Sequence, residues 1–503
     1  MQTVQVEAAC GRLEGLADQG VVAFRGIPFG RSARFRPSER AVPWAGVRQA
    51  HANGLIASQN PHIFEGLIGR TPGAQGEDCL NLNVFAPTIN GTRRPVLVWI
   101  HGGAFVTGSG CFAVYDGTHL AQRGAVVVTI NYRLGAFGFL RLAGQGNGEI
   151  TATGTEGLGD QILALRWVRD NIAAFGGDPG NVTLFGESAG SMSVASLLAA
   201  PAAKGLFHKA ILQSGGAHVG RLPDHADRIA ARFLKHADLG THEAHKLRDA
   251  PREHLLKAQA AVIADADQPG DPHHLGAMPF QPMIDGSLLP CMPIDAIRHA
   301  SAAGIPLIAG TTTEEWKLWA GPDTRLRAMD EERLARWAER QFGDYASRLL
   351  AADGRGSAFE RYVAMQTTRV FREPTLRLLA AQSPLAPVYE YVFDWRSPFL
   401  DGALGACHAL ELGFVFGTYG MEPANQFFGS GPQADAVSQA MMAAWVSFAR
   451  DGVPVISGVE AWPQWRAQSP AAMVFGADSR PAHVVEFEID AAWHGLPDGL
   501  VGT

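Results

Sequence analysis

The chain has 503 residues, of which 47% are hydrophobic and 18% are charged, and its formal net charge is −7. This composition is that of a globular protein with a substantial core, and it excludes a disordered or low-complexity chain. The acidic balance offers no basic surface for nucleic acid or anionic lipid, so we expect a small uncharged or hydrophobic substrate.

The N-terminal residues and the cysteines bear on where the protein works. Residues 1–10 contain no basic segment followed by an apolar stretch, so we expect no secretory signal. No run of 18 uncharged apolar residues predicts a membrane span. The five cysteines are odd in number, lie far apart and form no CxxC pair. Together these features favour a reducing, cytoplasmic location without a membrane partner.

Short apolar segments alternate with helical periodicity from about residue 80 onward. Strands are predicted at 81–85, 96–100, 125–130, 182–185, 210–213 and 306–309. Their boundaries carry Gly, Asn or Pro, as expected for strands buried on both faces. Between two of them, residues 160–175 place apolar side chains at helical spacing. This alternation predicts an α/β fold with a mainly parallel central sheet flanked by helices.

The segment 220–275 differs from the rest, because it is rich in His, Ala, Asp and Arg. We interpret it as a helical cap inserted into the fold, with a second helical insertion at roughly 320–385. No internal repeat and no long linker divides the chain. The sequence therefore predicts one domain over residues 1–503 with helical caps.

Residues 182–191, Val-Thr-Leu-Phe-Gly-Glu-Ser-Ala-Gly-Ser, place a G-x-S-x-G motif between a predicted strand and a helical run. A nucleophile on a sharp strand-to-helix turn has strained backbone angles, and side chains two residues away on either side would collide. Gly186 and Gly190 remove those collisions, so Ser188 is the candidate nucleophile. A Gly/Ser turn without catalytic function is the alternative that the motif by itself leaves open.

A second motif, His101-Gly-Gly-Ala-Phe105, follows the strand at 96–100 and opens a glycine-rich loop. Acyl transfer needs backbone N–H groups directed at the oxyanion that develops in the transition state. A loop of this kind supplies them in α/β-hydrolases, together with the N–H of the residue after the nucleophile, here Ala189. Taken by itself, the motif is interpreted as a tight turn. Together with Ser188, it favours a catalytic role.

These motifs belong to a longer set that resembles the type-B carboxylesterases, the cholinesterase-like α/β-hydrolases, and bacterial para-nitrobenzyl esterases most of all. The segments that carry the resemblance are 24–28, 77–84, 131–140, 158–161, 171–179, 186–190 and 444–452. The resemblance implies the α/β-hydrolase fold and the activity of a serine carboxylesterase. It disfavours a cholinesterase, because the loop at 60–78 lacks the tryptophan that holds choline.

The resemblance also implies the remaining catalytic residues. His408 precedes a Phe-Val-Phe-Gly sequence and matches the general base, and Glu315 matches the acid that orients it. Trp316 replaces a glycine of the family pattern, so Glu314 is the alternative acid. The order Ser, acid, His is that of α/β-hydrolases. The oxyanion hole is implied to consist of the backbone N–H groups of Gly103, Ala104 and Ala189.

Several polar residues receive structural roles from the same resemblance. The implied ion pairs are Arg34 with Glu77 and Arg133 with Asp160. Glu187 is interpreted as a buried anchoring carboxylate and not as an acid catalyst. Ser214 is either a support behind His408 or an ordinary serine at a strand end.

We expect neither a cofactor nor a metal ion. Residues 144–148, Gly-Gln-Gly-Asn-Gly, lack the strand, helix and later acid of a nucleotide loop. His273 and His274 lie near several aspartates, and we interpret them as a polar loop.

The sequence predicts hydrolysis of short- to medium-chain or aryl carboxylic esters through an acyl-enzyme intermediate. The same residues would serve a carbamate or an activated amide, and a non-catalytic binding module on this fold is a third reading. We expect a monomer or a dimer with a small-molecule ester as its partner. An apolar substrate pocket is predicted from nearness to the motifs, lined by Phe64, Phe105, Thr107, Met192, Phe280, Trp316 and Phe414.

Overall fold

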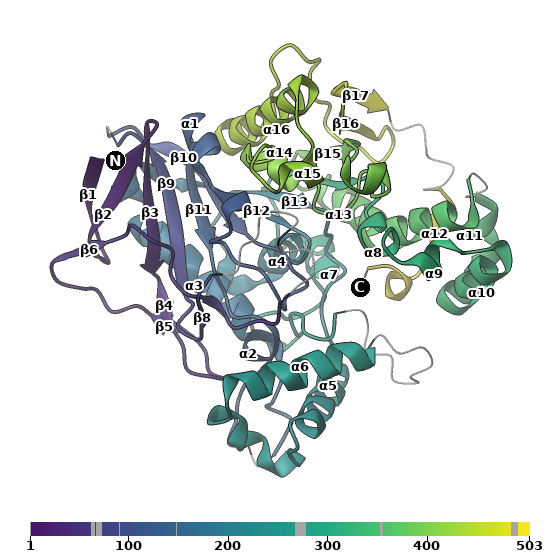
Figure 1. Cartoon of the computed structure of the whole chain (residues 1–503), viewed down its shortest axis with the longest axis horizontal. Coiled ribbons are helices and arrows are strands. Elements are labelled where there is room, and N and C mark those ends of the chain that lie inside the picture. Colours follow the sequence, from purple (N-terminus) through teal and green to yellow (C-terminus); the bar gives the residue numbers. More distant parts are fainter. Residues whose placement is uncertain are drawn as a thin grey trace.

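The computed structural model describes residues 2–61, 66, 73–89, 91–146, 148–266, 278–352, 356–483 and 491–502. Within these residues, 13 strands form one sheet in the order β1-β2-β3-β9-β11-β10-β12-β13-β14-β15-β16-β17, with β6 beside β2 (Figure 1). The strands are β1 (Gln2–Ala8), β2 (Gly11–Asp18), β3 (Val21–Pro28), β6 (Val47–Gln49), β9 (Asn81–Pro87), β10 (Arg94–Ile100), β11 (Val126–Ile130), β12 (Gly177–Glu187), β13 (Lys209–Gln213), β14 (Leu307–Thr312), β15 (Val388–Phe393), β16 (Ala471–Phe475) and β17 (Arg480–His483). Two short pairs stand apart, β4 (Gly30–Arg31) with β5 (Glu39–Arg40) and β7 (Ile56–Ala57) with β8 (Gln75–Gly76).

The central strands are parallel, and the outer strands are antiparallel except for β6, which pairs with β2 in parallel. Strands β11, β10, β12, β13, β14, β15 and β16 pair in parallel. The six strands expected from the sequence lie at β9 to β14, and the predicted α/β fold is confirmed. Because parallel strands point the same way, the loops after β10, β12 and β14 emerge at one edge of the sheet.

Both faces of the sheet are covered, as the apolar strands require. Val96, Val98 and Ile100 of β10 lie in one apolar core, and Leu97 and Trp99 lie in the other. The first core includes side chains of α3 (Glu156–Asn171), α4 (Ala189–Ala199), α7 (Pro293–Arg298) and α13 (Glu373–Gln382). The second includes side chains of α1 (Thr118–Gln122), α14 (Leu412–Phe416) and α16 (Pro432–Asp451).

The two segments interpreted as caps are helical where the structure describes them. Residues 220–266 form α5 (Pro223–His236), η4 (Thr241–Arg248) and α6 (Arg252–Ala266), and α5 and α6 lie together at the bottom of Figure 1. Residues 317–352 and 356–372 contain α8 (Lys317–Ala320), α9 (Thr324–Arg327), α10 (Glu331–Phe342), η5 (Gly343–Tyr345), α11 (Ala346–Ala352), α12 (Ala358–Thr367) and η6 (Thr368–Arg372). Helices α10, α11 and α12 build a separate apolar cluster with residues 492–501. The reading of the chain as one domain with two caps stays a prediction.

The remaining helical segments are short. They are η1 (Ala113–Tyr115), α2 (Gly135–Phe139), η2 (Ile172–Phe175), η3 (Pro201–Ala203), η7 (Phe399–Gly402), α15 (Asn425–Phe428) and η8 (Asp498–Leu500). No helix in the described ranges is long and apolar enough to cross a membrane. The predicted polar loop with His273 and His274, and the predicted pocket residue Phe64, lie outside the described residues.

Candidate active site

Ser188 lies at the turn between β12 and α4, where its backbone has the strained angles φ 56° and ψ −124°. A Cβ atom on Gly190 would lie 2.0 Å from the Ile100 carbonyl oxygen, and one on Gly186 would lie 2.5 Å from the Gly190 carbonyl carbon. Neither approach is possible for a residue with a side chain, so both glycines are required for this turn. The strain presents Ser188 at the edge of the sheet where the loop after β10 also lies.

The loop after β10 folds against this turn. A Cβ atom on Gly102 would lie 3.1 Å from the Ser188 Cβ, which places the loop in contact with the serine. Gly103 (φ 114°) accommodates the Thr107 carbonyl oxygen, which would lie 2.3 Å from an added Cβ. Within the described residues, the N–H groups of Gly103, Ala104 and Ala189 donate to no protein acceptor. Three such donors beside a serine suit the stabilisation of an oxyanion.

His408 and Glu315 meet at the same edge from different elements. Glu315 follows β14 and His408 precedes α14, and the two residues are 0% and 4% exposed. His408 Nδ1 lies 2.6 Å from Glu315 Oε2, and Glu315 Oε1 accepts a hydrogen bond from the Thr312 N–H at 2.9 Å. A short bond of this kind is charge-assisted and fixes the orientation of the ring.

Glu314, the alternative acid, is directed elsewhere. Its carboxylate pairs with Lys317 and with Arg396, the latter at 3.0 Å, and accepts the Ala406 N–H at 3.0 Å. Glu315 alone of the two carboxylates contacts His408. The geometry therefore favours Glu315 as the orienting acid.

The second nitrogen of His408 has a contact that the sequence did not predict. His408 Nε2 lies 3.0 Å from Glu187 Oε1, so the imidazole ring touches two buried carboxylates. Within the described residues, no hydrogen bond joins His408 to Ser188. The burial predicted for Glu187 is confirmed at 1% exposure, but its position beside His408 is new.

A third buried carboxylate, Glu411, lies close to this pair. It accepts hydrogen bonds from Ser214 Oγ at 3.1 Å and from the Tyr391 hydroxyl at 3.4 Å. Burial, reinforced by the charges of Glu315 and Glu187, raises the pKa of Glu411 to about 8. Ser214 therefore bonds to this carboxylate and not to His408 itself.

The electrostatics of the site stabilise a protonated His408. Burial by itself disfavours the imidazolium and lowers its pKa, but the charges of Glu187 and Glu315 outweigh burial and raise the pKa to about 10. A general base must be neutral to accept a proton. The two carboxylates therefore place the ionisation of His408 above the free-histidine pKa of about 6.5.

We expect kcat/KM for p-nitrophenyl acetate to keep rising with pH above 7, because the neutral fraction of His408 grows as the pH rises through its raised pKa. A pH–rate profile followed at the isosbestic wavelength of p-nitrophenol checks this. EDTA should leave the rates unchanged, since no proposed step uses a metal. A rate that is already level near pH 7 would contradict the expectation.

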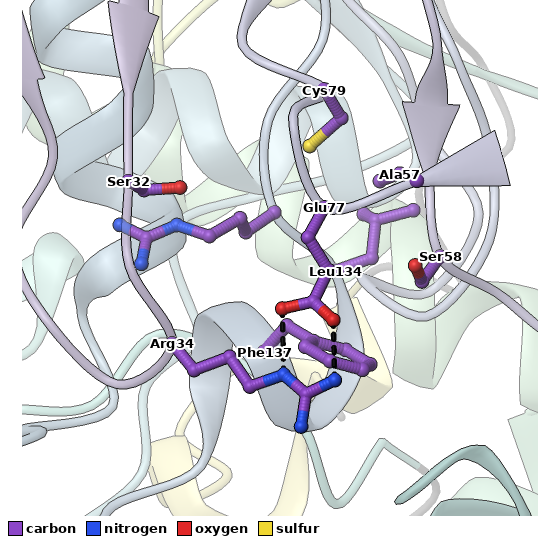
Figure 2. Close-up of a pocket in the computed structure, with 10 residues that line it drawn as sticks. Ser32, Arg34, Ala57, Ser58, Glu77, Cys79, Leu134 and Phe137 are labelled. Atoms are coloured by element: carbon purple, nitrogen blue, oxygen red, sulfur yellow. Dashed lines mark hydrogen bonds and ion pairs between the residues drawn. The ribbon is translucent and has the colours of Figure 1, made fainter. Parts of the chain in front are cut away.

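The predicted ion pairs are confirmed. Arg133 Nε and Nη2 each lie 2.7 Å from the Asp160 carboxylate oxygens, and both residues are buried. Arg34 Nε and Nη2 lie 2.7 and 2.5 Å from the two oxygens of Glu77 (Figure 2). The Arg34–Glu77 pair lines a small cleft together with Ser58 and Cys79. These paired charges support the loops around the sheet and act as scaffold.

The predicted pocket residues divide into two groups. Phe105 and Thr107 lie buried on the loop after β10, Met192 lies one turn into α4, and Trp316 follows Glu315. Phe105 and Met192 also belong to the apolar core. The other two lie away from the serine turn: Phe280 packs edge-on against Phe233, and Phe414 packs among Phe393, Trp395 and Tyr419. The contacts of Phe280 and Phe414 thus give no support for a pocket role, which stays a prediction for the set.

The sequence analysis missed two aromatic side chains that touch His408. The ring centroids of Trp319 and Phe371 lie 4.9 and 4.7 Å from the imidazole, and the Trp316 ring lies 4.9 Å from Trp319. Trp319 is 38% exposed, so part of its ring is free. The sequence signal that could have found Trp319 was its position four residues after Glu315, which is close to one helical turn. Phe371 offered no local signal.

A serine on a glycine-flanked elbow, free N–H groups beside it and a carboxylate-bound histidine place the chain among the serine hydrolases of the α/β-hydrolase fold. Comparison with known proteins then identifies the family. The model of the carboxylesterase family matches residues 2–488. The chain therefore belongs to the carboxylesterase family and is a carboxylic ester hydrolase, as the resemblance predicted.

The relatives include bacterial enzymes over nearly their full length. The chain is 38% identical to a para-nitrobenzyl esterase of Bacillus subtilis, covering 93% of this chain and 94% of that protein. It is 35% identical to a phenmedipham hydrolase of Pseudarthrobacter oxydans, covering 94% and 97%. Among solved structures, a carboxylesterase of Geobacillus stearothermophilus at pH 6.2 has a TM-score of 0.87 at 38% identity, covering 97% and 100%.

Proposed function

We propose that this carboxylesterase works through an acyl-enzyme on Ser188, with His408 as general base and Glu315 as the orienting acid. The contact between His408 Nδ1 and Glu315 Oε2 at 2.6 Å is the observation that supports it best. Neutral His408 accepts the Ser188 proton as the hydroxyl oxygen attacks the ester carbonyl. The N–H groups of Gly103, Ala104 and Ala189 stabilise the oxyanion.

The second half of the reaction uses the same groups. The tetrahedral intermediate collapses, and the imidazolium of His408 protonates the departing alcohol. Water, deprotonated by His408, then attacks the acyl-enzyme and releases the acid. Glu315 keeps its negative charge throughout and stabilises the imidazolium at each tetrahedral stage.

We further propose that the substrates are short- to medium-chain or aryl esters. The aromatic cluster of Trp316, Trp319 and Phe371 beside His408 supports an aryl group near the reacting bond, because aromatic rings pack favourably at such distances. A relative named para-nitrobenzyl esterase supports the same class. A small-molecule substrate, a monomeric or dimeric state and a cytoplasmic location complete the proposal.

Among p-nitrophenyl esters of increasing acyl length, we expect kcat/KM to peak at short to medium chains. Each methylene that fits the pocket contributes about 0.8 kcal/mol, and the gain ends when the pocket is full. A series from acetyl to palmitoyl, measured below the critical micelle concentrations, checks this. Rates that still climb at palmitoyl length would indicate a lipase.

The carbamate alternative is tested on the same preparation. A relative is named phenmedipham hydrolase, so phenmedipham is the comparison substrate for p-nitrophenyl acetate. A higher kcat/KM for phenmedipham would favour the carbamate reading. A fluorophosphonate probe that failed to label Ser188 in the folded protein would instead favour a non-catalytic module.

A further inference from the structure

The C-terminal residues 498–502, which begin with η8, are held by side chains from distant parts of the chain. Asp498 accepts hydrogen bonds from Arg298 of α7 and from Arg377 of α13, each at 2.6 Å. Its carboxylate also lies 2.9 Å from Nε2 of His218, in the loop after β13. Hydrogen bonds, first from His218 and then from the two arginines, hold the pKa of the Asp498 carboxyl well below its ordinary value. One carboxylate thus ties the C-terminal residues to three elements, and in Figure 1 these residues lie beside α7.

The same residues are bonded to η6, a turn of π-helix that joins α12 to α13. The Gly502 N–H donates to the Arg369 carbonyl at 2.8 Å, and Arg369 Nη1 donates to the Gly502 carbonyl at 3.2 Å. Directly after η6, Glu373 pairs at 2.8 Å with Arg377, the arginine that Asp498 holds. Residues 498–502 therefore contact η6 itself and, through Arg377, the residue that follows it.

Phe371 of η6 links this contact to the active site. Its ring centroid lies 4.7 Å from that of His408 and 6.0 Å from that of Trp319, which itself lies 4.9 Å from the imidazole. Because the Phe371 and Trp319 centroids are only 6.0 Å apart, the two rings cannot lie on opposite faces of the imidazole. Glu315 holds only the Nδ1 corner of His408, so the packed rings limit how far Nε2 can turn.

We propose that residues 498–502 form a C-terminal clasp that fixes η6, and that Phe371 is thereby a positioning residue that holds His408 where Ser188 needs it. This role depends on the proposed function of His408 as the general base. Packing locks the rotamer of a reacting side chain, and a displacement of about 1 Å costs roughly 100-fold in rate. A turn of π-helix at this place agrees with the frequent use of such turns at functional sites.

Asp498→Asn removes the charge that holds the C-terminal clasp, with little change of shape. We expect kcat and kcat/KM for p-nitrophenyl acetate to fall by the same factor, roughly tenfold, because a misplaced His408 weakens the transition state and not substrate binding. The fold is checked by circular dichroism. A wild-type kcat in the folded variant would overturn the proposal.

Asp227→Asn is the matched control. The Asp227 side chain is 36% exposed and that of Asp498 is 38% exposed, and Asp227 pairs with Arg141 at 2.9 Å from α5, in the other cap. We expect kcat of this control to stay within about twofold of wild type, since a half-exposed ion pair away from the site contributes little. An equal loss of kcat in both variants would mean that any lost ion pair slows the enzyme, and the proposal would fail.

A double-mutant cycle with Phe371→Leu separates positioning from a general loss of stability. If the C-terminal clasp acts through Phe371, adding Asp498→Asn to Phe371→Leu should lower kcat no further, whereas independent effects multiply. Multiplied effects, or a wild-type kcat in Phe371→Leu, would overturn the proposal. A wild-type kcat in His408→Gln would instead contradict the proposed function, so the two failures are distinguishable.

Hydrogen exchange followed by mass spectrometry gives a readout that does not depend on activity. In Asp498→Asn we expect faster exchange in residues 498–502 and also in residues 368–372, with α16 unchanged. Faster exchange confined to residues 498–502 would overturn the proposal. Arg298→Gln weakens the same contact from a side chain that is 40% exposed. If Asp498→Asn fails to fold, Arg298→Gln carries both the kinetic and the exchange measurement, with smaller effects in the same direction.

Discussion

Ser188→Ala is expected to reduce kcat for p-nitrophenyl acetate by roughly 10⁴–10⁶-fold, leaving the residual rate that oxyanion binding supports. The Ser188 hydroxyl oxygen is the atom that bonds to the acyl group, so no neighbouring group replaces it. Alanine is smaller than serine and fits the turn. We therefore expect the circular dichroism spectrum and the melting temperature of the variant to change little.

Ser191→Ala is the matched control for this substitution. Ser191 lies on α4 one turn after the nucleophile, and its hydroxyl donates to the Gly215 carbonyl at 2.6 Å. Loss of that hydrogen bond lowers the free energy of unfolding by about 1 kcal/mol but removes no reacting atom. If Ser188→Ala retained activity within tenfold of wild type, the nucleophile would be another serine.

Glu315→Gln is expected to lower kcat by roughly 10³–10⁴-fold. The amide is neutral, so the imidazolium that forms as Ser188 attacks loses its partner at 2.6 Å, and the amide N–H₂ can turn toward Nδ1 and impose the wrong tautomer. The loss should fall on kcat more than on KM, because the charge of His408 develops in the transition state. Steady-state kinetics on p-nitrophenyl acetate measure both.

Glu314→Gln is the control that separates the loss of the contact with His408 from the loss of a negative charge alone. Glu314 pairs with Lys317 and Arg396, and its side chain is 22% exposed, so its charge is partly screened. We expect kcat within a few-fold of wild type. The reverse order of effects would mean that the catalytic acid lies one residue earlier than Glu315.

The sequence by itself determined the features that depend on local backbone and on apolar patterning. The strands from β9 to β14 were predicted because a segment buried on both faces must be short, apolar and bounded by turn residues. The elbow at Ser188 was predicted because its strained angles exclude side chains at positions 186 and 190, a requirement that the glycines meet locally. The resemblance then selected His408 and Glu315 from many histidines and acids.

The tertiary structure alone decided which groups surround His408. Glu187 and Glu315 come from β12 and from the loop after β14, and no local pattern says that their charges converge on one ring. Likewise Phe280 and Phe414 lie near motifs in sequence but pack into the core, whereas Trp319 keeps an exposed edge beside the imidazole. The physical reason is common to all these cases. Burial, pKa and contact depend on what the other elements bring to the same edge of the sheet, and that arrangement exists only in the folded chain.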